Sequence, residues 1–193
     1  MSSPAGKREA IVAAATELFR LYGFRKTSVD QIAQTAAVAK PTVYAYFEDK
    51  DAVFVAVCQA VMERIVAGAR AARDEADVVE RVAAVLGAKF TTIYELVESS
   101  PHARELLASR NDEANRVVAA ADAEYEELLV GTLRAAARAG ELDVAALGGA
   151  PALAKLLRRA GHGASYDATS VEMHRASLQA LVRAVLRAGL VRG

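Results

Sequence analysis

The sequence has a single cysteine, no tryptophan and only four prolines, and its 24 basic residues are balanced by 24 acidic ones. One cysteine, Cys58, cannot form an internal disulfide, which is typical of a reducing compartment. Zero net charge argues against a protein that coats nucleic acid or membranes by bulk charge. No stretch has the pattern of a secretory signal or of an uninterrupted membrane span of about 20 apolar residues. We therefore expect a cytoplasmic protein with no membrane partner.

Strict alternation of apolar and polar residues is also nearly absent, whereas apolar residues recur every three or four positions along most of the chain. This periodicity predicts an all-α protein. Hydrophobic residues make up 53% of the chain and aromatic residues only 6%. Because most of the apolar residues are Ala, Val and Leu, the composition favours closely packed helices over a sheet.

Start and stop signals locate the helices. The first covers residues 7–22 and ends before Gly23, which suits a helix C-terminus. The second begins at Ser28, whose hydroxyl forms a capping box with Gln31. The third has Pro41 in its first turn, where a missing N–H is tolerated. Further helices are predicted from Lys50 to about residue 70 and over 78–98, 101–109, 113–139, 150–160 and 169–188, the last opened by a capping box of Thr169 and Glu172.

The second and third predicted helices are short and are joined by a tight turn at residues 37–39. Two such helices are typical of a helix-turn-helix unit, whose second helix enters the major groove of DNA. At about 100° per residue, Val43 and Phe47 share the side that faces the core. The opposite side is formed by Pro41, Thr42 and Ala45, with Tyr44 and Tyr46 at its edges.

This outer side is small at its centre and has hydroxyl groups at its rim, so its backbone can approach base edges while its rim contacts phosphates. Lys40 and Lys50 lie at its two ends. Thr27 and Ser28 stand at the start of the second helix, where unpaired N–H groups favour a phosphate oxygen. The predicted DNA-binding residues are Thr27, Ser28, Lys40, Pro41, Thr42, Tyr44, Ala45, Tyr46 and Lys50.

Residues 7–54 resemble the DNA-binding domain of the TetR (tetracycline-repressor-like) family of bacterial regulators. The family patterns L-F-x-x-x-G-[FY], T-[TS]-V-x-x-I-A and V-x-K-x-T-[LV]-Y-x-[HY]-F-x-x-K correspond here to LFRLYGF, TSVDQIA and VAKPTVYAYFEDK. The resemblance implies a homodimer that binds a palindromic operator in double-stranded DNA and responds to a small molecule. It further implies base-edge or nearby contacts from Lys40, Thr42, Ala45 and Tyr46, and phosphate contacts from Thr27, Tyr44 and Lys50.

Three positions depart from the family pattern. Ala37 replaces the usual glycine of the interhelical turn, so we expect a strained left-handed residue that costs about 1 kcal/mol. Ala39 replaces the usual helix cap before the third helix. Asp30 replaces a frequent cation, which removes one expected phosphate contact.

The predicted domains are a helix-turn-helix domain at residues 1–50 and a larger helical domain for ligand binding and dimerisation at 51–193. Apolar residues of the last two helices form a stripe wide enough to need cover on two sides. The stripe by itself fits an intramolecular core as well as a four-helix dimer interface. Because one short helix reads few bases, we favour the dimer. The predicted interface residues are Leu153, Leu156, Leu157, Leu178, Leu181, Val182 and Val185.

A ligand pocket is predicted between the fourth helix and those at 78–98 and 113–139. Each candidate residue taken alone is more typical of core packing. The few charged residues on these inner faces favour an apolar or aromatic effector. The candidate pocket residues are Cys58, Met62, Phe90, Tyr94 and Tyr125.

Catalysis is the competing function class. Cys58 lies on an apolar helix stripe without a nearby His in sequence, and the spacing of the three histidines is not that of a metal site. A nonspecific architectural DNA-binding protein would be more basic. We therefore predict a ligand-responsive transcriptional repressor without enzymatic activity, cofactor or metal, with an activator or a nonspecific DNA-binding protein as the alternatives.

Overall fold

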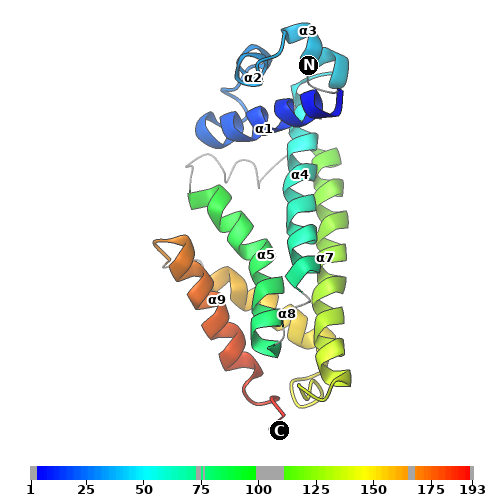
Figure 1. Ribbon diagram of the computed structural model, residues 1–193, viewed down its shortest axis with the longest axis vertical. Helices are drawn as coiled ribbons and strands as arrows, with labels where there is room; N and C mark the ends of the chain where they lie inside the picture. Colours follow the sequence, from blue (N-terminus) through cyan, green and yellow to red (C-terminus); the bar gives the residue numbers. More distant parts are fainter. Residues whose placement is uncertain (1–3, 73–74, 76, 99–110, 165–167, 192–193) are drawn as a thin grey trace. The chain divides into compact units, whose positions relative to one another are not determined.

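The computed structural model describes residues 4–72, 75, 77–98, 111–164 and 168–191, and its regular elements in these residues are α-helices (Figure 1). The all-α prediction is confirmed. The helix predicted over 101–109 lies outside the described residues. The helices are α1 (Pro4–Tyr22), α2 (Val29–Thr35), α3 (Lys40–Tyr46), α4 (Lys50–Ala71), α5 (Val78–Glu98), α7 (Asp112–Arg138), α8 (Ala150–Gly163) and α9 (Val171–Leu186).

Most predicted boundaries agree with the structure to within a few residues, and α5 agrees at both ends. The N-cap of α9 was predicted one residue too early. Ser170, not Thr169, is its N-cap, and the Ser170 hydroxyl accepts a hydrogen bond of 3.1 Å from the Met173 N–H. Two adjacent hydroxyl residues offer the same capping chemistry, so the sequence does not distinguish them.

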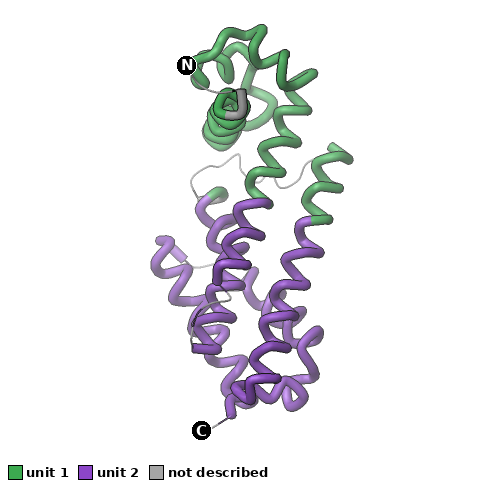
Figure 2. The backbone as a smooth tube through the Cα atoms, turned by 45° about the vertical axis from the view of Figure 1, so that its right-hand side comes forward, with its two compact units in different colours: residues 1–62, 96–120 green, residues 63–95, 121–193 purple. Residues whose placement is uncertain are grey.

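The chain forms two compact units (Figure 2). Unit 1 comprises residues 1–62 and 96–120, and unit 2 comprises residues 63–95 and 121–193. The predicted division at residue 50 does not match these units. α4 begins at Lys50, but its first turns contribute Val53, Phe54 and Val57 to the buried core of unit 1. A helix contributes to whichever core its apolar face meets, so a domain boundary need not coincide with a helix start.

The core of unit 1 is built around three phenylalanine rings. Phe19 of α1 lies with its ring centroid 5.4 Å from that of Phe24 and 6.0 Å from that of Phe54, and the Phe24 and Phe54 centroids are 5.1 Å apart. These tilted and edge-to-face arrangements are the favoured geometries for aromatic pairs. The α2 residue Ile32 and the α3 residue Val43 are buried in the same cluster, so α2 and α3 are fixed on α1.

The core of unit 2 is formed by apolar faces of α4, α5, α7, α8 and α9. α4 and α5 approach closely at Gly68, where an added Cβ would lie 3.3 Å from the Cβ of Ala88. The ammonium of Lys89 in α5 forms an ion pair of 2.6 Å with Asp122 in α7. The largest fully buried side chains of this unit are Ile65, Leu86, Tyr125, Leu129, Leu133, Leu142, Leu153, Leu157 and Leu178.

The end of unit 2 is fixed by a short antiparallel contact between Leu142 and Leu190. The Asp143 N–H donates to the Gly189 carbonyl at 2.7 Å. A Cβ on Gly189 would lie 2.8 Å from the Asp143 carbonyl oxygen, a distance that real Cβ atoms do not show. The close backbone contact therefore requires glycine at this position.

Among the described residues, α4 is the helix that is long and apolar enough to cross a bilayer by length and composition. Its buried residues include Val53 and Phe54 in unit 1 and Ile65 and Val66 in unit 2. A helix apolar on several sides that fills the core of a globular protein passes the same test. We therefore interpret α4 as a core helix.

Candidate functional site

The start of α2 has the predicted capping box. The Gln31 N–H donates to the Ser28 hydroxyl oxygen at 3.2 Å, and the Ser28 N–H donates to the Gln31 side-chain oxygen at 2.8 Å. Two backbone donors at the helix end are thereby satisfied reciprocally. Ser28 itself is exposed at this positive helix end.

The turn between α2 and α3 has the predicted strain. Ala37 adopts a φ of 54°, and it is the one non-glycine residue with positive φ in the described part of the chain. The Val38 N–H then bonds the Ala33 carbonyl at 3.0 Å, which closes the end of α2. Ala39 starts α3 without a side-chain cap, as the sequence indicated.

The two sides of α3 differ in burial as predicted. Val43 and Phe47 are buried in the core of unit 1, whereas Lys40, Pro41, Tyr44 and Ala45 are exposed. Phe47 lies just past the helix end in extended backbone, with φ of −139° and ψ of 127°, so the chain direction there, rather than helical phase, places its ring. Tyr44 is 49% exposed, so its ring and hydroxyl are accessible on a helix whose other side is anchored in the core.

Thr42 and Tyr46 are half-buried, and Tyr46 packs against the unit 1 core. Their polar atoms therefore lie on side chains with restricted freedom. A restricted side chain loses less conformational entropy when it binds. Both residues remain candidates for DNA contact.

The charged group at the start of α3 is already paired. Lys40 Nζ lies 2.9 Å from Asp30 Oδ2 in the first turn of α2. The hydrogen bond to Asp30 raises the pKa of Lys40 above its ordinary value. The ammonium thus stays charged, but a phosphate would have to compete with Asp30 for it.

Thr27 does not have the role expected from the sequence. Its side chain is only 2% exposed, and its hydroxyl donates to the Gly23 carbonyl at 2.9 Å and lies 3.3 Å from the Leu18 carbonyl. It thereby ties the segment before α2 to carbonyl groups in the last turn of α1 and just past its end. A hydroxyl buried in this way cannot contact a phosphate, so the predicted phosphate contact from Thr27 is wrong.

Lys50 also has an internal role that the sequence did not indicate. Its ammonium donates to the Phe24 carbonyl at 2.8 Å and to the Thr27 carbonyl at 2.9 Å, and it lies 4.3 Å from the centre of the Phe24 ring. Two of the three ammonium donors thus bind the segment between α1 and α2. One donor is left for a phosphate.

Sequence reasoning passed over Arg25 and Lys26, two exposed basic residues in the segment before α2. The signal for them was available, because two consecutive basic residues two and three positions before a helix N-cap place positive charge near an anion-favouring helix end.

None of the five residues predicted to form the effector pocket lines the cavity of unit 2 that is described below. Cys58 packs half-buried against the core of unit 1, where burial raises the pKa of its thiol to about 11, and Met62 is buried. The other three are packed in unit 2. Tyr94 stacks on His174 with centroids 4.5 Å apart and donates its hydroxyl to the Ala168 carbonyl at 2.8 Å. Phe90 packs edge-on against His162, and the Tyr125 hydroxyl donates to the Leu86 carbonyl at 3.4 Å.

Unit 2 instead has an open cavity of about 790 Å³ between α5 and α9, with contributions from Arg64 of α4 and from Glu75. Six charged side chains line it, so the expectation that few charged residues face the ligand does not hold for this cavity. The lining residues are Arg64, Glu75, Glu80, Ala83, Ala84, Gly87, Ala88, Thr91, Thr92, Glu95, Glu172, Arg175, Ala176, Leu178 and Gln179.

The residues predicted for a dimer interface fall into two groups. Leu153, Leu157, Leu178 and Val182 are buried within unit 2 itself, so for these four the intramolecular core is the correct interpretation. The other three, Leu156, Leu181 and Val185, are not buried, and Leu156 is 52% exposed. Only these three are available to a second copy of the chain.

Comparison with known proteins identifies the N-terminal pattern. Residues 11–57 match the model of the bacterial regulatory proteins of the tetR family. The chain is 35% identical over 69 residues to the transcriptional regulator RutR of Escherichia coli (strain K12), covering 36% of this chain and 32% of RutR. It is 34% identical over 88 residues to the transcriptional activator FasR of Mycolicibacterium smegmatis, covering 45% of this chain and 40% of FasR. The matched stretch thus spans well under half the length of these relatives.

The fold is similar over a greater length. The structure of SmeT, the repressor of a Stenotrophomonas maltophilia multidrug efflux pump, superimposes with a TM-score of 0.70 over 96% of this chain and 91% of SmeT, at 20% sequence identity. At that identity, the likeness is one of fold. This likeness in fold covers the C-terminal helices as well as the helix-turn-helix segment.

Proposed function

We propose that this chain, which belongs to the TetR family of bacterial regulatory proteins, is a transcriptional repressor that binds a specific operator and is released from it by a small molecule. The observation that carries this proposal is the α2–α3 unit, because its buried side fixes α3 and its opposite side is left exposed. Such a protein acts on the chromosome, so we place it in the cytoplasm.

The DNA-contacting surface is proposed to be the exposed side of α3 with its flanks. Pro41, Thr42 and Ala45 face base edges, where small side chains permit close approach. Tyr44 and Tyr46 lie at the edges and donate hydroxyls to phosphates or bases. The start of α2 adds phosphate contacts from Ser28 together with Arg25 and Lys26. Lys40 contributes once Asp30 is displaced, and Lys50 contributes its remaining donor.

A two-fold dimer is proposed because a seven-residue recognition helix reads few base pairs. Two copies on paired half-sites about 34 Å apart double the number of bases read. The interface residues left available to a partner are Leu156, Leu181 and Val185 on α8 and α9. A chain that stays monomeric at micromolar concentration would contradict this part of the proposal.

Coupling between effector and DNA is proposed to run through α4. This single helix contains Lys50, which bonds the segment before α2, and Arg64, which lines the cavity of unit 2. A ligand that prefers one position of α4 shifts the population of DNA-binding states by its difference in affinity for them. We propose release on ligand binding. Because the relative FasR is an activator, activation by this chain has to be tested as the alternative to repression.

The test is selection of bound sequences from random double-stranded DNA with the full chain. We expect enrichment of a palindrome, with binding that weakens steeply as salt rises. Thr42→Ala and Tyr44→Ala should each weaken binding to the selected site by about tenfold, equivalent to loss of one good contact. Tyr22→Ala is the matched control, because Tyr22 of α1 is 50% exposed and lies outside α3.

Equal affinity for all sequences would contradict the repressor proposal and favour a nonspecific DNA-binding protein. A reporter placed behind the selected site then gives the sign of regulation. Higher expression when the gene for this chain is deleted supports a repressor, and lower expression identifies an activator.

A further inference from the structure

We infer that the cavity between α5 and α9 binds an elongated organic amine, with its cationic group held by Glu75 and Glu80. This inference rests on the proposed function, because the ligand of this cavity would be the effector. It replaces the apolar or aromatic effector that the sequence suggested.

The two arginines that line the cavity are both paired with the carboxylate of Glu95. Arg64 lies 3.0 Å from Glu95, and Arg175 lies 3.5 Å from the other oxygen of the same carboxylate. Glu172 is nearby on α9, and its pKa is lowered by hydrogen bonds from its own backbone and from Ser170. Two arginines and two glutamates therefore stand together at this end.

The opposite end of the cavity is negative. Glu75 and Glu80 line it, and no lining residue there is a cation. Glu80 accepts from the Gln179 amide at 2.5 and 2.6 Å, with Arg183 outside the lining at 3.5 Å. The other nearby cation, Arg81, binds Glu141 and the Glu75 backbone carbonyl. A carboxylate pair with so little compensation attracts an ammonium group and repels an anion.

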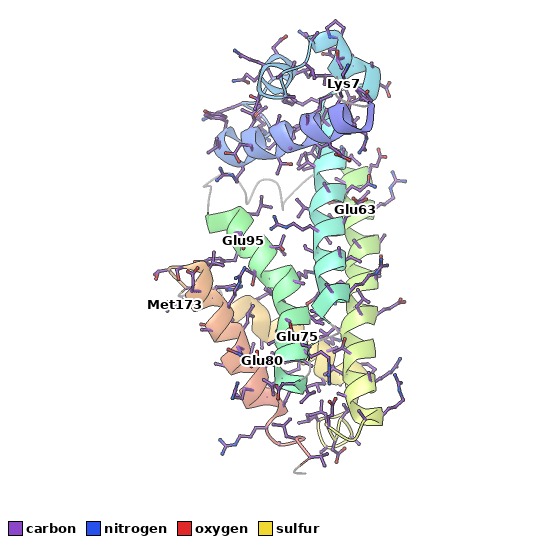
Figure 3. All side chains as sticks on the ribbon, in the orientation of Figure 1. Lys7, Glu63, Glu75, Glu80, Glu95 and Met173 are labelled. Carbon is purple, nitrogen blue, oxygen red and sulfur yellow. The ribbon has the colours of Figure 1, made fainter. Side chains whose placement is uncertain are left out.

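The wall between the two ends is formed by the small residues Ala83, Ala84, Gly87, Ala88 and Ala176. Glu80 and Glu95 stand at opposite ends of α5, as Figure 3 shows. At 1.5 Å per residue, their separation along the helix is roughly 22 Å. A long, narrow ligand with an apolar body fits a surface of this composition and length.

Thr91 is an independent indication of a ligand. It lines the cavity, it is only 7% exposed, and its hydroxyl oxygen has no hydrogen-bond partner among the described residues. Buried hydroxyls in native proteins are nearly always paired, and an unpaired one calls for an absent partner. Thr91 lies eleven residues from Glu80 in α5, or roughly 16 Å along the axis, so a polar group at the far end of the amine would supply that partner.

The test uses three probes built on the same eight-carbon chain, each with a hydroxyl at one end and an amine, a hydroxyl or a carboxylate at the other: aminooctanol, octanediol and hydroxyoctanoate. With a hydrogen bond at each end, such a chain spans about 16 Å. Binding to the full chain without DNA is measured by calorimetry. We expect aminooctanol to bind at least about fivefold more tightly than octanediol, and hydroxyoctanoate to bind most weakly.

The variants locate the binding site. Glu75→Gln together with Glu80→Gln should weaken aminooctanol binding by about fivefold, and Thr91→Val should weaken it by about threefold. Glu75→Gln alone covers the case in which the double variant does not fold, because Glu75 is exposed. Glu127→Gln on α7 is the matched control, since Glu127 is an exposed glutamate of unit 2 outside the lining. Preference for hydroxyoctanoate, or unchanged binding in the glutamate variants, would overturn the inference.

Failure here is distinguishable from failure of the proposed function. If the chain binds its selected palindrome but not aminooctanol, the amine inference is wrong and the repressor proposal stands. If it binds aminooctanol through Glu75 and Glu80 but no DNA sequence specifically, the cavity assignment stands and the repressor proposal is wrong.

Discussion

Lys40 and Asp30 form an ion pair across the helix-turn-helix unit, with Nζ of the lysine 2.9 Å from Oδ2 of the aspartate. The lysine is the first residue of the proposed recognition helix α3, and the aspartate lies in the first turn of α2. Both side chains are largely exposed, so the pair adds little to stability. Its effect is on the surface charge, because Asp30 neutralises a cation at the site where a phosphate is expected.

Asp30→Asn should therefore strengthen binding to nonspecific DNA by about two- to fivefold at low salt. The substitution releases Lys40 and removes a negative charge that repels phosphates. The slope of log affinity against log salt should steepen by about 1, because one more phosphate is neutralised. Fluorescence anisotropy over a salt series measures both quantities. Glu9→Gln makes the same charge change at an exposed position of α1, and an equal effect there would show that only net charge matters.

Lys50→Met should lower the free energy of unfolding by about 2 kcal/mol. Methionine keeps most of the side-chain volume but leaves the carbonyls of Phe24 and Thr27 without their charged donor. Chemical denaturation measures the change. Lys26→Met, at an exposed lysine, should change stability by less than about 0.5 kcal/mol. A Lys50 variant with native stability and weaker DNA binding would instead show that Lys50 serves the phosphates alone.

Ala37→Gly should raise the free energy of unfolding by roughly 0.5–1 kcal/mol. A φ of 54° strains any residue with a Cβ, and the relief exceeds the entropy that glycine adds to the unfolded chain. Ala36→Gly is the neighbouring control, because Ala36 has a φ of −75° and should lose stability when it becomes glycine. Equal destabilisation by both substitutions would contradict the strained turn.

Unit 2 should lose stability as the pH falls below about 6.5. His174 is fully buried and stacked on Tyr94, and burial lowers its pKa below the ordinary value. The unfolded chain therefore takes up a proton on this histidine at a higher pH than the folded chain does. The contribution of neutral His174 to stability is complete above about pH 6.5, the pKa in the unfolded chain, and it decreases as the pH falls below that value.

Thermal unfolding between about pH 5 and pH 8 measures this loss. His174→Phe keeps an aromatic ring against Tyr94 and should flatten the acid side of the profile. A variant at exposed His162 should keep it. If His174→Phe leaves the acid dependence unchanged, another group is responsible.

The residues that could be predicted are those governed by their immediate neighbours in sequence. Ser28 and Gln31 form a capping box because they are three positions apart, and Ala37 is strained because the short turn needs a left-handed residue. Val43 is buried because helical phase points it towards α1. Each of these outcomes is decided within one or two helical turns, which is the range over which sequence patterns are informative.

The roles of Thr27 and Lys50 could not be predicted in the same way. A threonine before an N-cap and a lysine at a helix start both suit a phosphate site. The structure assigns them instead to carbonyls of Leu18, Gly23 and Phe24, and Lys50 is 26 residues from Phe24. Which acceptor a long or rotatable side chain uses depends on the packing of α1, α2 and α4 together.

The C-terminal helices show most clearly which features the sequence determines and which depend on tertiary structure. Their periodicity and caps determined where α5, α7, α8 and α9 form, because a helix is specified by local propensity and by one apolar face. Only the tertiary structure decided that Leu178 and Val182 are covered within unit 2 while Leu156 is exposed, and that charged rather than aromatic residues line the cavity between α5 and α9. The identity of an apolar residue does not indicate which surface will bury it, and a cavity forms where packed helices do not contact each other. Both depend on contacts between residues far apart in the chain.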